Sequence, residues 1–276
     1  YQQSKDEGFL EACESLLADK LVTLQWWEED QGKDGFFVID PSDVIGENEA
    51  ASLGAVTTSA GAGKALCYYH DPNGVVVGIW KNQWSALSPD EGKSWTPRVA
   101  SASLMTCGAK VWGQRTDDGL YALIYNHSAT RRNRFPLVVM TGEDGHTFRN
   151  MLCLQGEVPP KRYQGIHKNP GPQYTRGIME GNGNPPGDRL WVTYSMNKED
   201  IWVSRVPVPI KLSVDGPVED NFDDVAAGET VPDWNLYSGV WAPVEVVAIP
   251  EGKGRALRLA DRDPYDYAKA VRVFQE

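Results

Sequence analysis

Two eight-residue stretches of the chain share one pattern: residues 88–95 read SPDEGKSW and residues 141–148 read TGEDGHTF. Both have the form Ser/Thr-x-Asp/Glu-x-Gly-x-Ser/Thr-aromatic, and they begin 53 residues apart, which is the length of one four-stranded propeller blade. In such a turn the carboxylate accepts backbone N–H bonds, the glycine supplies a positive φ and the aromatic ring packs beneath. Each octad is therefore predicted to form the hairpin between the two outer strands of a blade.

The sequence around the octads is typical of short strands separated by tight turns. Turn residues such as Asp-Pro-Asn-Gly at 71–74 and Asp-Asp-Gly at 117–119 separate segments rich in β-branched and aromatic residues. These predicted strands are residues 21–26, 74–80, 119–126, 135–140, 189–194 and 201–206. Only residues 1–20 favour a helix, because apolar residues recur there at three- and four-residue spacing and Asp6 is a possible N-terminal cap. The sequence therefore predicts an all-β meander with a helical start.

Composition narrows the class of function. The chain has 276 residues and a net charge of −11, which argues against nucleic-acid partners and anionic membrane surfaces, since both require a basic footprint. No apolar run is long enough to span a bilayer, so no membrane insertion is expected. The four widely spaced cysteines exclude the common zinc patterns and leave free thiols and two disulfides equally open; no metal and no cofactor is expected. Ten Trp and 11 Tyr supply flat surfaces suited to sugars.

The octads resemble the Asp-box, the repeat of sialidase-type β-propellers; the first is a full match, and the second departs at Glu143 and Phe148. Residues 173–183 (QYTRGIMEGNG) and 190–207 also resemble bacterial sialidase-like propeller proteins of polysaccharide-degrading organisms, so the resemblance covers about residues 68–212. It implies a sialidase-like β-propeller and a periplasmic or extracellular location. In that family the Asp-boxes are structural and lie far from the active site.

The pattern changes after Pro209. Residues 219–224, 234–241 and 255–261 resemble the opening strands of a concanavalin-like β-sandwich. The predicted organisation is a β-propeller portion over residues 1–212 and the start of a jelly-roll β-sandwich over residues 213–276. The propeller portion supplies only about three to four blades, fewer than a closed ring typically has. The chain is therefore expected to expose unpaired strand edges and to have the remaining portion of the same protein as a partner.

The strongest candidate site is the stretch 161–184, which is rich in Gly and Pro and dense in Arg, Tyr, His and Glu. In an extended strand Tyr174, Arg176 and Glu180 have the same parity and face one side. A Tyr beside a carboxylate is what a sialidase-like retaining mechanism needs, because the carboxylate polarises the phenol for attack on the anomeric centre of an acidic sugar. The alternative is a buried structural network. Residues 197–200 (NKED) are interpreted as a solvated hairpin turn, with a pocket role as the alternative.

Basic and imidazole side chains complete the set of candidates. Arg134, at a strand entry, and Arg115, before a turn, suit the bidentate capture of a sugar carboxylate or sulfate. His127 and His167 are plausible pocket residues, and Tyr163 lies close to His167 in the sequence. A structural role is the alternative for each of the two histidines.

The predicted function is that of an exo-acting, sialidase-like glycoside hydrolase on a terminal acidic sugar of a glycan or polysaccharide. In this hypothesis Tyr174 and Glu180 form the nucleophilic pair, and Arg134 and Arg176 anchor the acid group. The expected partner is therefore an acidic carbohydrate.

Two other functions stay open. One is a polysaccharide lyase acting on a uronate, with His167 and either Tyr163 or Tyr174 as base and acid. The other is a propeller that binds carbohydrate without catalysis. In each case the candidate side chains are expected around one central depression, with Asp90 and Glu143 at the outer rim.

Overall fold

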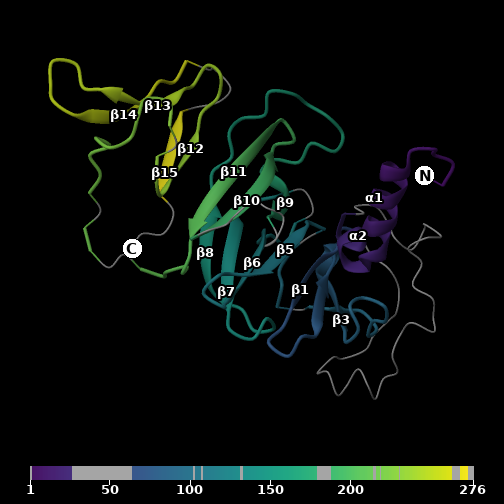
Figure 1. Ribbon diagram of the computed structural model, residues 1–276. Helices are drawn as coiled ribbons and strands as arrows, with labels where there is room; N and C mark the ends of the chain where they lie inside the picture. The colour runs from purple at the N-terminus through teal and green to yellow at the C-terminus, as the bar shows by residue number, and fades with distance from the viewer. Residues whose placement is uncertain are drawn as a thin grey trace.

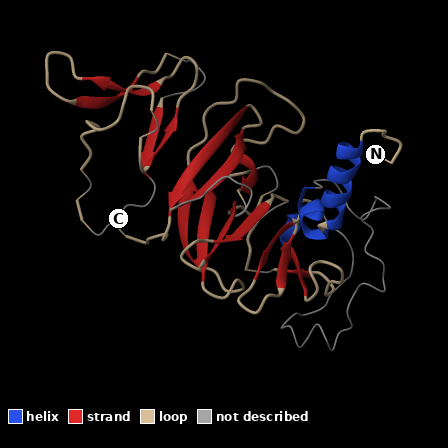
Figure 2. Ribbon diagram, in the orientation of Figure 1, coloured by secondary structure: helices blue, strands red, loops and turns tan. Residues whose placement is uncertain are grey.

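The computed structural model describes residues 2–26, 64–101, 103–106, 108–130, 133–178, 188–213, 216–217, 219–229, 231–262 and 268–272. Within these ranges the protein consists of antiparallel sheets preceded by two helices (Figure 1; Figure 2). The predicted fold class is confirmed: the chain is mostly β, with a helical start.

The helical start comprises α1 (Glu7–Ala18) and α2 (Lys20–Trp26). Asp6 caps α1, as the sequence predicts, by accepting a backbone N–H of the first turn at 3.0 Å. The prediction of a strand after residue 20 is wrong, because that segment is α2. Leu21 and Leu24 lie one helical turn apart and are both buried against the first sheet, so tertiary packing outweighs the local preference for a strand.

Three sheets follow, which we call blades 1, 2 and 3. Blade 1 has the order β1-β2-β3-β4 and contains β1 (Cys67–His70), β2 (Val76–Ile79), β3 (Trp84–Ser88) and β4 (Val99–Ala100), with the short helix η3 (Lys81–Gln83) before β3. Blade 2 has the order β5-β6-β7-β8 and contains β5 (Val111–Arg115), β6 (Tyr121–Asn126), β7 (Leu137–Gly142) and β8 (Arg149–Gln155). Blade 3 has the order β11-β10-β9 and contains β9 (Pro172–Gly177), β10 (Arg189–Met196) and β11 (Asp200–Pro207).

The first strand of each blade lies beside the first strand of the next, so that β1 contacts β5 and β5 contacts β9. Between β1 and β5, the Cys67 thiol donates to the carbonyl of Gly113 at 3.2 Å, and the Gly113 N–H donates back to the sulfur at 3.0 Å. Burial raises the pKa of the Cys67 thiol to about 12, so the thiol stays protonated as a structural donor.

Two glycines allow this close approach of the inner strands. A Cβ at Gly113 on β5 would lie 2.5 Å from the ring of Tyr69 on β1. A Cβ at Gly177 on β9 would lie 2.0 Å from the indole nitrogen of Trp112 on β5. Any larger residue would force the neighbouring strand away, so the contact between successive blades requires glycine at both positions.

Apolar clusters fill the spaces between neighbouring layers. One lies between α2 and blade 1, one between blades 1 and 2, and one between blades 2 and 3, where it continues to β12. Their most buried large side chains include Trp80, Tyr121, Ile124 and Leu190. The blades are therefore packed face to face, as in a propeller.

The first octad connects β3 to β4, as the sequence predicts. The Asp90 carboxylate accepts the backbone N–H of Ser94 at 2.8 Å, the Ser94 hydroxyl at 2.7 Å and the Ser88 hydroxyl at 3.0 Å. Burial alone would raise the pKa of Asp90, but these hydrogen bonds outweigh it and the pKa is lowered. Beneath the turn Trp95 is buried against Trp80, with ring centroids 5.3 Å apart.

The second octad connects β7 to β8 and uses a different carboxylate from the one its pattern suggests. Asp144, and not Glu143, accepts two backbone N–H groups of the turn, at 2.8 and 2.6 Å. The short Asp side chain at this position reaches the N–H groups two and three residues ahead, which lowers the pKa of Asp144. His146 in turn bonds to Asp71 of blade 1 at 3.0 Å, so this octad also ties blade 2 to blade 1.

Two further small sheets follow blade 3: β12 (Trp234–Tyr237) pairs with β15 (Lys269–Arg272), and β13 (Val244–Ala248) pairs with β14 (Arg255–Leu259). β12 docks on the outer edge of β11. The Asn235 amide accepts the N–H of Arg205 at 2.6 Å and donates to its carbonyl at 3.0 Å, while the Tyr237 ring stacks on Trp202 with centroids 4.5 Å apart. The Asn235 side chain thus satisfies the backbone N–H and C=O groups of one residue on the open edge of β11. The domain boundary at residues 212–213 stays a prediction.

The described part of the chain shows the state of three cysteines and the character of the helices. Cys13, Cys67 and Cys153 are free thiols, while Cys107 lies outside the described residues. No described helix has the length and apolar character that crossing a membrane requires.

The different carboxylates of the two octads predict different effects of substitution. Asp90→Ala and Asp144→Ala each leave backbone N–H groups without their acceptor, so each should lower the free energy of unfolding by about 1–3 kcal/mol. Glu143→Ala is the matched control and should change it by less than about 0.5 kcal/mol. Chemical denaturation measures all three, and a loss at Glu143 as large as the loss at Asp144 would contradict the observed hydrogen bonding.

Candidate functional site

Loops at one edge of the three blades enclose a polar cavity of about 220 Å³, which we call the basic cavity. Four of its lining residues are cations, and none of its described lining residues is a carboxylate. The cavity is therefore electropositive within a protein of net charge −11. Its lining consists of Lys81, Gly108, Ala109, Lys110, Asn126, Arg134, His167, Asn169, Gln173, Tyr174 and Lys198.

Three of the four cations occupy equivalent places in the three blades. Lys81 lies between β2 and β3, Arg134 between β6 and β7, and Lys198 between β10 and β11. Each is thus in the connection between the second and third strands of its blade. Lys110 directly precedes β5, in the connection that enters blade 2. In an antiparallel meander these connections emerge at one edge and the octads at the other, so the basic cavity lies away from the octads.

Tyr174 enters the cavity through a β-bulge. In the pairing of β9 with β10, Gln173 lies opposite Ser195 and Arg176 lies opposite Thr193, so two residues of β9 face one residue of β10. Tyr174 has a φ of +56° at this break, and its side chain is 44% exposed. The bulge places Gln173 and Tyr174 together in the cavity lining and leaves Arg176 out of it.

Positive charge surrounds the phenol ring. The Nζ atoms of Lys81, Lys110 and Lys198 lie 5.7, 5.5 and 5.1 Å from the centroid of the Tyr174 ring. A hydrogen bond from Lys198 is the main cause of a lowered Tyr174 pKa; the charges of Lys198, Lys81 and Arg134 act in the same direction, and burial opposes them. The site therefore stabilises the phenolate of this tyrosine relative to the same group in water.

The turn that carries Lys198 is held by the residue before it. The side-chain oxygen of Asn197 accepts the N–H of Gly171 at 2.9 Å, and its Nδ2 donates to the carbonyl of Pro159 at 2.8 Å. Both ends of the long connection between β8 and β9 are thus attached to the turn between β10 and β11.

The residue after Lys198 holds the middle of the same connection. The Glu199 side chain, 3% exposed, accepts the backbone N–H groups of Arg162 at 3.0 Å and Tyr163 at 2.8 Å, and it pairs with the Lys168 ammonium. Burial would raise the pKa of Glu199, but these contacts outweigh it and the pKa is lowered. Glu199 therefore positions the segment that contains His167.

Asn126 and Arg134 are joined at the cavity wall. The Arg134 N–H donates to the carbonyl of Pro170 at 3.2 Å, and its own carbonyl accepts from Nδ2 of Asn126. Nδ2 of Asn126 also donates to the carbonyl of Pro172 at 2.8 Å. The other amide atom, the buried Oδ1 of Asn126, has no hydrogen-bond partner among the described residues.

The structure brings together three of the site residues expected from the sequence: Arg134, His167 and Tyr174 all line the basic cavity. Arg176 lies instead with its guanidinium 5.8 Å from the ring centroid of Trp112 on the inner strand β5. The bulge at Tyr174 accounts for this separation, because it breaks the alternation on which a shared face depends.

Three other expected residues are outside the cavity lining. Tyr163 is 67% exposed, with the Lys168 ammonium 5.2 Å from its ring. Nδ1 of His127 hydrogen-bonds to the Tyr125 hydroxyl at 3.1 Å. Arg115 ends β5 at the edge where the octads lie, opposite the cavity. Their roles in substrate binding stay predictions.

Three lysines of the cavity, Lys81, Lys110 and Lys198, were not among the site residues expected from the sequence. One signal was available, because Lys81 and Arg134 each precede the start of their octad by seven residues. The pocket role held as the alternative for the turn at 197–200 matches the place of Lys198. Glu180 lies outside the described residues. In the described part of the chain, no group of three or more His, Cys, Asp or Glu could hold a metal ion.

Comparisons with known proteins match both ends of the chain to families. Residues 1–42 match a family described as "N-terminal beta propeller", and residues 234–276 match one described as "Sialidase-like, CBM domain". A solved structure titled "Sialidase" matches with a TM-score of 0.76 and 36% sequence identity, over 98% of this chain and 22% of that chain. This chain thus spans about a fifth of that relative's length. No curated protein matches the sequence.

The surroundings of Tyr174 predict a specific titration. Lys198→Met removes both the hydrogen bond and the nearest charge, so the pKa of Tyr174 should rise toward its usual value. Tyrosinate absorbance measured against pH, with Tyr174→Phe as the reference that removes this phenol, gives the pKa. Lys93→Met deletes the same charge in the first octad and should leave the titration unchanged. An unaltered Tyr174 titration in Lys198→Met would contradict the role given to Lys198.

Proposed function

Because the chain carries part of a sialidase-like β-propeller and a sialidase-like CBM domain, we propose that it acts as an exo-acting glycoside hydrolase on a terminal acidic sugar of a glycan or polysaccharide. The observation that carries this proposal is the basic cavity, in which four cations surround an accessible tyrosine. The similarity to a sialidase supports the class of reaction, and the charge of the cavity supports the class of sugar.

The cavity suits an acid group on electrostatic grounds. Lys81, Lys110, Arg134 and Lys198 come from three blades and line one small space, so an acid group that enters is attracted by several cations at once. Arg134 is the guanidinium suited to a bidentate contact with a carboxylate. Arg176, over Trp112, receives no contact with the substrate in this proposal.

Tyr174 is the proposed nucleophile. Its phenol oxygen forms a bond to the anomeric carbon while the glycosidic C–O bond breaks, and the leaving oxygen takes up a proton; water then releases the sugar from the tyrosine. The neighbouring cations assist by stabilising the negative charge that develops on the phenol oxygen as its proton leaves. Glu180 is the proposed base that receives the phenol proton, on the strength of the sequence alone. Because the phenol gives up its proton only as it attacks, it meets the sugar's own acid group as a neutral side chain and avoids the repulsion that an ionised Asp or Glu would meet.

A lyase is the second candidate, because His167 and Tyr174 line the same cavity. In a lyase one of them would take the C5 proton of a uronate whose carboxylate is neutralised by the cations, and the other would protonate the leaving oxygen. No water is consumed, and the product carries a carbon–carbon double bond. A propeller that binds acidic carbohydrate without turnover would use the same cavity and give no product.

We further propose which partners the chain has and where it meets its substrate. The chain spans 22% of the related sialidase chain, so further blades of a longer protein would complete the wall of the basic cavity. The partner is an acidic carbohydrate, which the sialidase-like CBM domain would help to retain. We propose that the protein meets this substrate in the periplasm or outside the cell.

Product analysis with matched variants tests the proposal. Incubation with acidic oligosaccharides should release a reducing acidic sugar with no ultraviolet-absorbing double bond, and Tyr174→Phe should lower kcat by about 100-fold or more. Tyr121→Phe, an equivalent change at a tyrosine whose hydroxyl donates to the carbonyl of His70 at the edge of the octads, should leave kcat unchanged. An unsaturated product would favour the lyase, and full activity of Tyr174→Phe would exclude Tyr174 as the nucleophile.

A further inference from the structure

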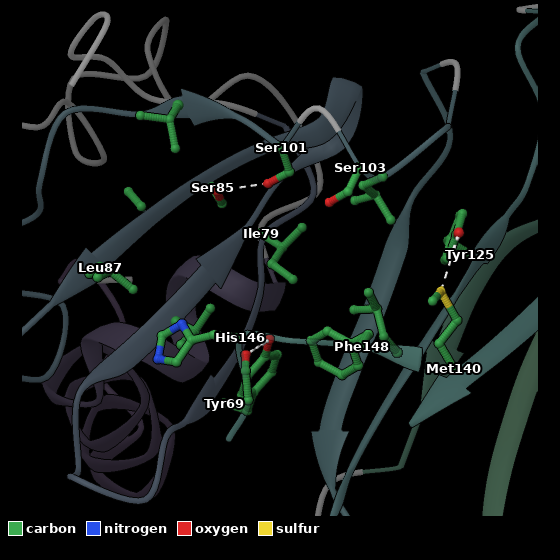
Figure 3. Close-up of a pocket in the computed structure, with 16 residues that line it drawn as sticks. Tyr69, Ile79, Ser85, Leu87, Ser101, Ser103, Tyr125, Met140, His146 and Phe148 are labelled. Carbon is green, nitrogen blue, oxygen red and sulfur yellow. Dashed lines mark hydrogen bonds between the residues drawn. The ribbon is translucent and has the colours of Figure 1, made fainter. Parts of the chain in front are cut away.

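A second cavity, of about 230 Å³, lies between blades 1 and 2 and shares no lining residue with the basic cavity. We call it the inter-blade cavity (Figure 3). One wall comes from β2 and β3 of blade 1, and the facing wall comes from β6, β7 and the second octad of blade 2. The apolar side chains of these two walls are Val77, Ile79 and Leu87 on one side and Leu123, Met140 and Phe148 on the other.

Polar groups gather at one end of this cavity. Ser85 and Ser101 hydrogen-bond to each other at 3.0 Å, and the Ser103 hydroxyl lies beside them (Figure 3). At the other end the polar atoms are already engaged, because Tyr69 donates to the carbonyl of Gly145 at 2.7 Å and His146 bonds to a carboxylate of blade 1. A ligand would therefore find hydroxyl groups at the serine end and apolar contacts along both walls.

The last residue of the second octad contributes to the space. In the first octad this position is Trp95, which is fully packed under its turn. In the second it is Phe148, a smaller ring that is only partly buried and faces the cavity. The departure from tryptophan at this position thus leaves room between the blades, and Phe148→Trp is the substitution that restores the pattern and reduces that room.

Charge and size define what could occupy the cavity. No Lys, Arg, Asp or Glu is among its described lining residues, and its histidine, His146, already bonds to Asp71, so a charged ligand would be desolvated without a free partner of opposite charge. A dry apolar cavity of about 150 Å³ accommodates benzene, so this somewhat larger space suits one ring with a small substituent. A sugar would leave most of its hydroxyls against apolar walls. An aromatic ring, in contrast, gains edge contacts with Phe148 and a sulfur contact with Met140.

From these features we propose that the inter-blade cavity is a binding site for a neutral, single-ring phenol. The ring lies between Ile79 and Leu87 on one side and Met140 and Phe148 on the other, and the phenol hydroxyl bonds at the serine end. This site is independent of the function proposed for the basic cavity.

Titration of the 276-residue chain with p-cresol, read on its methionine methyl groups by NMR, tests this proposal. The ε-methyl signal of Met140, assigned through Met140→Leu, should shift and saturate, because a ring current acts on it at close range. The charged analogue 4-hydroxybenzoate should bind at this site about tenfold more weakly or not at all, since its carboxylate has no counter-charge there.

Cavity-reducing variants complete the test. Phe148→Trp and Leu87→Trp should each lower the affinity for p-cresol by about tenfold or more, as read from the methyl signals of Met140 and its neighbours. Phe9→Trp makes the same chemical change on the exposed face of α1 and should leave the affinity for p-cresol unaltered. Thermal melts identify folded variants, and either filled variant is sufficient if the other does not fold. The proposal is overturned if p-cresol gives no saturable shift at Met140, if 4-hydroxybenzoate binds as tightly, or if the folded filled variants bind as the unmodified chain does.

Discussion

The contact of the inner strand β5 with β1 on one side and β9 on the other is the constraint on which the remaining structure depends. The thiol of Cys67 and the backbone of Gly113 hold β1 to β5, and Gly177 lets β9 approach the indole of Trp112. This contact brings the equivalent loops of successive blades to one edge, and the face-to-face packing of the blades closes the apolar clusters between them. Loops that are some 50 residues apart in the chain therefore enclose one cavity.

The basic cavity concentrates charge that the sequence distributes widely. Lys81, Arg134 and Lys198 lie in the same connection of three blades, and each would be an ordinary surface cation in an isolated hairpin. The contacts of Asn197 and Glu199 with the neighbouring loop fix the turn that carries Lys198 and so hold this lysine at the cavity. The lowered pKa of Tyr174 is a direct electrostatic consequence of this arrangement.

The octads made the fold predictable, because their pattern encodes a local turn and their spacing encodes a blade. The helix at 20–26 was mistaken for a strand since its burial against blade 1 depends on distant residues. The cavity was predictable in part: Arg134, His167 and Tyr174 were found from their chemistry, and the constant offset of Lys81 and Arg134 from the octads was a usable signal. The exclusion of Arg176 was not predictable, because a bulge at Tyr174 breaks the strand alternation and no residue type marks it.

The most direct test of the account is the affinity of the basic cavity for an acidic sugar and its neutral counterpart, measured by calorimetry with glucuronate and glucose. The account predicts that glucuronate binds more tightly than glucose. It also predicts that Arg134→Gln lowers the affinity for glucuronate by about tenfold or more and hardly changes the affinity for glucose. Arg149→Gln, beside the second octad at the opposite edge of the blades, should change neither affinity. Equal binding of the two sugars, or an equal effect of the two arginine substitutions, would contradict the claim that equivalent loops of successive blades form a site for an acid group.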